Sequence, residues 1–304
     1  MADATRLMQS ELAEDATALK EAAQRYYDEH KKTDKFCNSP VRSKFLSQNY
    51  LDNYLLVEAL CKNLKFSLAL TRIVFCGLRL SLDAMQVLNE ALLKNRVVKD
   101  LALNFCLLDA PLLEALMPCF CQNQSLETVD LSCNALDDRV SYLVAKIVSG
   151  QSERRDLVVW SYALRGEQPP DDEHKQGLKQ LILAHNNFAD STASELVLAL
   201  RNDLHMRSVD LRNNQVSERW CSEFARLMTD NRTLTNVDLR LNPGFSQKTH
   251  RELALGLLRN IQDLKAKGEL ESLDESVEIK SKFVRSEVLT VEIPKKCKLH
   301  SDNG

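Results

Sequence analysis

The stretch that decides the fold is Leu126–Asn134, LETVDLSCN, which has apolar residues at its first, fourth and sixth positions and an asparagine at its ninth. Leu126, Val129 and Leu131 alternate well enough to form a short strand with one buried face. Asn134 carries an amide that can satisfy backbone groups of the turn that leaves the strand. The stretch therefore predicts a short strand followed by a tight turn.

The same pattern occurs six times along the chain. Its copies start at residues 70, 98, 126, 178, 206 and 234, so the intervals are 28, 28, 52, 28 and 28 residues. The ninth position holds Asn186, Asn214 and Asn242 in the last three copies, Cys106 in the second and Leu78 in the first. The interval of 52 is 24 longer than the others. We therefore expect six copies with one insertion at about 151–174.

A helical stretch follows each predicted strand, with apolar residues such as Trp220, Phe224 and Leu227 at helical spacing. One strand and one helix cannot enclose a core, but stacked units can. The period resembles the ribonuclease-inhibitor class of leucine-rich repeats. We predict an α/β solenoid over residues 70–262, with a parallel sheet on its concave face and helices on its convex face.

The segments that flank the repeats are expected to cover the ends of the stack. Residues 1–35 are predicted to form one polar N-terminal helix, and residues 36–69 a cap with a helix and a degenerate strand around Phe45. Residues 263–304 form a C-terminal extension in which Val291 and Ile293 alternate briefly among charges. This extension is either a covering strand or disordered.

Composition excludes several classes of function. The chain has 304 residues and a formal net charge of -3, so it offers no positive field for a nucleic acid. It has no apolar run long enough for a membrane span and no leader, so we expect a cytoplasmic protein. Nine cysteines without paired spacing are interpreted as reduced thiols, mostly in the core.

No arrangement of residues predicts catalysis. The six histidines are spread over unrelated parts of the chain without metal-ligand spacing, and no phosphate-binding or nucleophile motif is present. His185 is expected on the inner face of the sheet, but no acid is placed to orient it as a base. We therefore expect no enzyme, no cofactor and no metal.

The exposed strand positions form the first candidate contact surface. Because parallel neighbours lie about 4.8 Å apart, Asp210 should stand beside Asp238, and Arg212 beside Arg240. These columns either neutralise each other or present charges to a partner. The earlier strands offer a less charged groove, and the candidate contact residues there are Phe105, Ile182 and His185.

The insertion is the second candidate surface. Leu157, Trp160 and Leu164 stand at i, i+3 and i+7, which predicts a short amphipathic helix before the proline pair that begins at residue 169. Its apolar stripe either folds back along the rim of the third and fourth copies, the interpretation that we prefer, or awaits a partner. Arg154, Arg155 and Arg165 are further candidate contact residues.

The segments FCNSPVRS at 36–43 and ERRDLVVWSYALRGEQPP at 153–170, with the repeats after them, resemble the family of the centrosomal protein of 78 kDa over residues 36–262. This resemblance implies a centriolar or basal-body protein of ciliogenesis that acts through protein contacts, including contacts with ubiquitin-ligase components. A related role in the ciliary axoneme stays open. The alternative is a regulator of a small GTPase, or a ubiquitin-ligase adaptor, elsewhere in the cytosol.

Overall fold

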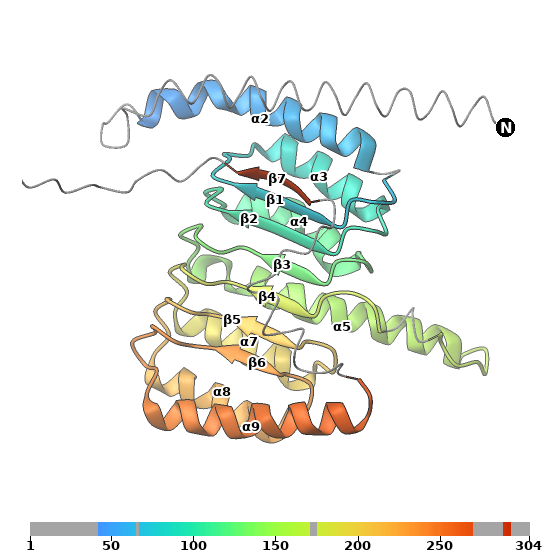
Figure 1. The fold of residues 1–304 in the computed structure, drawn as a ribbon, viewed down its shortest axis with the longest axis vertical. Coiled ribbons are helices and arrows are strands. Elements are labelled where there is room, and N and C mark those ends of the chain that lie inside the picture. Colours follow the sequence, from blue (N-terminus) through green and yellow to red (C-terminus); the bar gives the residue numbers. More distant parts are fainter. Residues whose placement is uncertain (1–41, 65–66, 171–174, 270–287, 293–304) are drawn as a thin grey trace, which may run out of the picture.

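A parallel β-sheet organises the molecule. The computed structural model describes residues 42–64, 67–170, 175–269 and 288–292 (Figure 1). The strands follow one another in the order β6-β5-β4-β3-β2-β1-β7, and each pairs with its neighbours in parallel. Their bounds are β1 Arg72–Cys76, β2 Asp100–Asn104, β3 Thr128–Asp130, β4 Gln180–Ile182, β5 Ser208–Asp210, β6 Asn236–Asp238 and β7 Val288–Glu292.

Helices form a second layer behind the strands (Figure 1). Their bounds are α2 Arg42–Leu64, α3 Leu82–Lys94, α4 Ala110–Gln122, α5 Ser141–Ala163, α7 Asp190–Asn202, α8 Glu218–Asp230 and α9 Gln247–Ala266, with a 3₁₀ turn at Asp138–Val140. Each helix packs on the next in chain order. The arrangement confirms the predicted α/β class and parallel sheet.

The core lies between the two layers because the recurring apolar positions point into it. Leu126, Val129 and Leu131 are each at most 1% exposed, and they share one continuous cluster with Leu113 and Leu116 of α4. Residues paired across consecutive strands from β1 to β6 are 28 apart in sequence, as for Val209 and Val237, except for the 52 residues between β3 and β4. The spacing of the apolar pattern thus sets the strand register.

The ninth-position asparagines form hydrogen bonds with backbone groups of the turns that follow the strands. The Asn134 side chain donates to the carbonyl oxygens of Leu103 (2.7 Å) and Leu131 (2.9 Å), and accepts from the N–H of Cys106 (2.8 Å). Asn186, Asn214 and Asn242 make equivalent bonds. These amides are buried, and each joins one turn to the next, as the pattern predicts.

A second column of buried amides, which the sequence analysis missed, stands at the helix ends. Asn95, Asn123 and Asn231 each follow a helix, and each side-chain oxygen accepts N–H groups of the next segment. Their amide groups donate to carbonyls about one unit earlier in the chain. The regular spacing of 28 residues from Asn95 to Asn123 is the sequence signal of this column.

The β1 side of the sheet differs from the expectations in one respect. The predicted strand around Phe45 is wrong, because that residue lies in helix α2. At the same side of the sheet, β7 pairs with β1, with Arg72 opposite Val288 and Cys76 opposite Glu292. Part of the C-terminal extension is thus a covering strand. The helix predicted over 1–35 lies outside the described residues.

Candidate functional site

The charged columns on the strand face are the first candidate site. Asp210 and Asp238 are paired in register, as predicted. The Arg212 guanidinium lies 2.8 Å from the Asp210 carboxylate and 3.5 Å from that of Asp238, and Arg240 binds Asp238 through both its Nε and Nη2. The columns therefore neutralise each other, which is the first of the two interpretations.

The aspartates also have a structural task at the strand ends. A carboxylate oxygen of Asp210 accepts the backbone N–H of Arg212 (2.9 Å), and Asp130 and Asp238 hold the residue two positions later in the same way. Asp210 is only 9% exposed, so it has little surface to offer a partner. Among these four charges, the Arg240 side chain is the most exposed, at 57%.

The environment of Asp238 sets its proton affinity. Burial alone would raise the pKa of this carboxyl, but the hydrogen bonds from the side chain and backbone of Arg240 outweigh burial, and its pKa lies below the ordinary value. Asp238 therefore stays ionised, and the pair with Arg240 persists, down to acidic pH.

Of the remaining strand-face candidates, Phe105 and His185 lie in the turns that follow the strands. Phe105 and His185 have positive φ angles of 56° and 57°, in a column with Cys133, Asn213 and Leu241. The N–H of His185 donates to the carbonyl of Arg212 (2.8 Å), and its ring Nδ1 lies 2.9 Å from the Asn213 side-chain nitrogen. Phe105 is 43% exposed. Ile182 remains on the strand, partly exposed, between Asp130 and Asp210.

The insertion departs most from expectation, because α5 does not end at Gly150. The helix continues to Ala163, so it has 23 residues where α3, α4, α7 and α8 each have 13. Gln151 keeps its place in the amide column and donates to the carbonyls of Phe120 (2.6 Å) and Asn123 (3.0 Å). The end of α5 projects beyond its neighbours (Figure 1).

Arg155 was predicted to contact a partner, and this prediction is wrong because the side chain is 1% exposed. Its guanidinium donates to the carbonyls of Gln176 (3.1 Å) and Leu178 (2.8 Å), and Arg154 also donates to Gln176. Both arginines therefore bind the segment that returns from the insertion. Gly177 has a φ of 105°, and a β-carbon there would collide with Gln151.

Arg155 also forms a buried ion pair, in addition to its bonds to the returning segment. Arg155 Nη1 lies 3.8 Å from Asp203 Oδ2, and neither atom has a hydrogen-bond partner among the described residues. Burial lowers the pKa of Arg155 to about 10, and burial also raises the pKa of Asp203 above its ordinary value. Asp203 takes the place of the asparagine in the amide column, and its other oxygen accepts the N–H of His205 and Met206.

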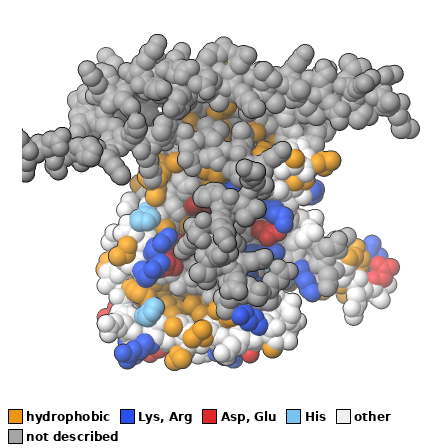
Figure 2. Space-filling view, viewed as in Figure 1, with side chains coloured by type: hydrophobic (Ala, Val, Ile, Leu, Met, Phe, Trp, Pro, Cys, Tyr) orange, Lys and Arg blue, Asp and Glu red, His pale blue; other side chains and the backbone are white. Residues whose placement is uncertain are grey.

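The apolar stripe of the insertion does not fold back along the rim, so the interpretation preferred from the sequence is wrong. Leu157, Trp160 and Leu164 are 63%, 61% and 67% exposed. Arg165 is exposed too; its guanidinium lies 4.8 Å from the centre of the Tyr162 ring and 3.8 Å from Glu167. Figure 2 shows hydrophobic and charged side chains together on the projecting part of the molecule.

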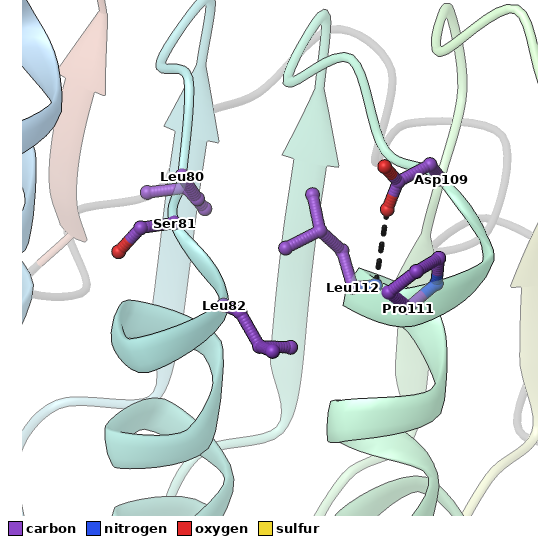
Figure 3. A pocket seen from close by; sticks show the side chains of 6 residues that line it. All are labelled: Leu80, Ser81, Leu82, Asp109, Pro111 and Leu112. Carbon is purple, nitrogen blue, oxygen red and sulfur yellow. Dashed lines mark hydrogen bonds between the residues drawn. The ribbon is translucent and has the colours of Figure 1, made fainter.

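A small open pocket lies beside the N-terminal ends of α3 and α4 (Figure 3). It is lined by Leu80, Ser81, Leu82, Asp109, Pro111 and Leu112. The Asp109 carboxylate faces back to its own helix, where it accepts the backbone N–H of Leu112 at 3.1 Å. The Ser81 hydroxyl accepts the backbone N–H of Ala84 in the same way, so both polar side chains of the pocket cap a helix.

The described residues hold no candidate metal centre and no activated thiol among Cys106 and Cys221. No three His, Cys, Asp or Glu side chains gather there where they could hold a metal ion. Burial raises the pKa of Cys106 to about 12 and that of Cys221 to about 11, so both are protonated thiols at neutral pH. In the same part of the chain, no helix is both long and apolar enough to span a bilayer.

The fold and these surfaces define an α/β protein of stacked strand and helix units with a charged strand face and a projecting apolar helix. No family model matches the chain. It is 28% identical over 222 residues to the mouse centrosomal protein of 78 kDa, which covers 72% of this chain and 27% of the relative. The human protein is 26% identical over 235 residues, which cover 76% of this chain and 33% of the relative.

The chain therefore resembles the family of the centrosomal protein of 78 kDa, as the segments quoted above predicted, and is related to centrosomal proteins. It spans between a quarter and a third of the length of these two curated relatives. Among solved structures, the leiomodin-1 actin-binding site 2 is 14% identical, with a TM-score of 0.41 over 72% of this chain and 95% of that one. An internalin from Listeria monocytogenes is 13% identical, with a TM-score of 0.23 over 68% and 74%.

Proposed function

We propose that this chain is a non-catalytic leucine-rich-repeat scaffold that binds other proteins at the centriole or basal body, or in the cilium. The single observation that carries the location is the similarity to centrosomal proteins over about three quarters of the chain. Ubiquitin-ligase components are included among the proposed partners because the family resemblance implies them.

The fold supports the scaffold part of the proposal. Stacked units with 28 residues between paired strand positions, and an asparagine ladder between their turns, fit a leucine-rich-repeat solenoid. In such an array every unit contributes one strand to an extended face, and that face can bind a large partner surface. The exposed Arg240 and Phe105, together with Ile182 and His185, are the residues that we propose for this contact.

The polar groups of this face support binding rather than catalysis. Asp210 and Asp238 are held by arginines and by backbone N–H groups, and the His185 ring lies against an amide rather than a carboxylate. A general base needs a free lone pair and an orienting acid. We therefore propose no chemical step for this surface.

Localisation of a tagged full chain in ciliated cells tests the function. We expect the tag to coincide with a centriole marker in dividing cells and with the basal body or axoneme after ciliation. The matched control carries Leu131→Asp, which disrupts the core and should abolish localisation. A folded wild-type protein that stays diffuse in both cell states would contradict the proposed location.

A further inference from the structure

The projecting end of α5 carries large apolar residues that face away from the core. We define residues 152–164 as the α5 extension. Its inner side is fixed, because Arg155 is buried and Arg154 binds the Gln176 carbonyl at 2.6 Å. The segment is therefore held at a set angle to the sheet rather than left to choose its own orientation.

The outer side of the extension carries Leu157, Trp160 and Leu164, which lie on one helical face because they are three and four residues apart. Apolar anchors at this spacing are how a helix occupies a groove in another protein. Exposed tryptophan and leucine side chains on a rigid support also meet the requirement of a preorganised contact.

Two acidic residues stand at the start of the same face. Glu153 precedes Leu157 by four residues and Asp156 precedes Trp160 by four, so both carboxylates lie beside the apolar stripe. Both are exposed, and within the described part of the chain neither has an ion-pair partner. A partner that fits this face therefore needs positive charge at one end of an apolar surface.

We propose that the α5 extension inserts into an apolar groove of a partner protein, and that basic side chains line the end of the groove that meets Glu153 and Asp156. This inference deepens the proposed scaffold function and rests on it, because it names how one partner is held. Leu157, Trp160 and Leu164 are the anchors in the groove, and the two carboxylates set the direction of the helix.

A second copy of this chain fits the α5 extension less well than a partner protein with a groove does. Three such side chains offer on the order of 400 Å² to a partner. A two-fold contact of the face with itself would then bury about 800 Å² in total, which is below the roughly 1,200 to 2,000 Å² of stable interfaces. A groove encloses the helix from the sides as well, so it also covers the side chains that flank the stripe.

A photocrosslinking experiment on the full chain tests the occupant. The probe is p-benzoylphenylalanine, placed at position 157 or 160 in cells, with position 198 on α7 as the control because Leu198 is equally exposed (58%). We expect both extension positions, and not position 198, to crosslink to one protein at residues that line an apolar groove with Lys or Arg at one end. Crosslinks to a second copy of the chain, or no crosslink specific to the extension, would overturn the proposal.

Affinity measurements on the crosslinked protein, purified with the full chain, give the second readout. Trp160→Ala should raise Kd about tenfold or more, as expected for an aromatic anchor, and Glu153→Lys should raise Kd and weaken its dependence on salt. Leu198→Ala should leave Kd unchanged. Trp160→Ala should also keep the wild-type melting temperature, since the side chain is exposed. An unchanged Kd would refute the groove, and a large fall in melting temperature would show that the residue is structural.

The two proposals fail in different ways. A wild-type chain that is diffuse in cells but crosslinks from positions 157 and 160 to a groove contradicts the centrosomal location and supports the docking helix. A chain that localises to centrioles, yet gives no crosslink from the extension, supports the location and contradicts the docking helix.

Discussion

Buried polar side chains decide how neighbouring units join in this molecule. Most units use an asparagine, such as Asn123 or Asn231, which holds the next segment without bringing a charge into the core. At the insertion the same task falls to Gln151, Arg155 and Asp203. The charged pair is thus a local replacement for an amide, and it carries the desolvation cost of two buried charges.

The Arg155–Asp203 pair can be tested by a double-mutant cycle. Arg155→Met leaves the Asp203 carboxylate buried without its counter-ion, so we expect a loss of roughly 3 to 5 kcal/mol of unfolding free energy. Arg155→Met combined with Asp203→Asn should recover part of that loss, because an asparagine can still accept the N–H groups of the next segment, whereas the carbonyls of Gln176 and Leu178 lose their donor. Urea unfolding at pH 7 of both single variants and the double variant completes the cycle. A double variant no more stable than Arg155→Met alone would argue against a pairwise interaction.

Asp238 should make stability depend on pH. Its pKa in the folded protein is below the ordinary value, so its contribution is present above about pH 4 and is lost as the pH falls through the folded-state pKa. Arg240→Gln removes the main partner, so this variant should be less stable than wild type at pH 7, with a difference that shrinks towards acidic pH. The urea concentrations at the unfolding midpoints of both proteins, measured between pH 7 and pH 3.5, give this difference. Arg226→Gln, which breaks an exposed pair on α8, should show no such trend.

At the scale of elements, the strands could be predicted from sequence and the end of α5 could not. Apolar residues at the first, fourth and sixth positions locate each strand and its register, because those side chains face a shared core. The repeat spacing places the start of the insertion at about residue 151, directly after Gly150. In the structure this glycine lies inside α5, where a β-carbon would come within 2.5 Å of the Cys121 sulfur. It is there for close helix packing, and its neighbours in sequence carry no sign of that contact.

The candidate surfaces, too, could be predicted from the sequence only in part. The adjacency of Asp210 and Asp238 follows from the repeat spacing alone. The burial of Arg155 does not, because it depends on the returning segment at Gln176 and Leu178, more than twenty residues later and outside the repeat pattern. The exposure of Trp160 likewise follows from where the helix ends rather than from its amphipathic spacing.

Removing the insertion should leave a regular array. Deletion of residues 153–176 takes out the 24 extra residues and joins Ser152 to Gly177, and Gln151→Asn with Asp203→Asn restores the amide column. We expect this variant to unfold cooperatively in urea with a midpoint near that of wild type. Deletion of 153–175 is the matched control. It shifts β4 by one residue and turns its buried face outward, so it should not fold. Equal behaviour of the two deletions would contradict the register described here.

The whole molecule depends on contacts between neighbouring units. Leu131 is fully buried in the middle of the array. Leu131→Asp places an unpaired carboxylate there and should cost more than about 4 kcal/mol. Because each helix packs on the next, the damage should spread to both sides of β3. Circular dichroism during thermal unfolding checks this. A cooperative transition near the wild-type temperature would show that the residue is not in the core.

The pairing of β7 with β1 has a consequence for the order in which the protein is completed during synthesis. Arg72 and its partner Val288 are separated by 216 residues of chain. At about 5 to 20 residues per second, the ribosome needs on the order of 10 to 40 seconds between them. During that time the outer edge of the first strand has no neighbour, although every other strand meets its partner soon after it emerges. The β1 edge of the nascent chain therefore stays open, as the kind of surface that chaperones protect, until the last described strand has been made.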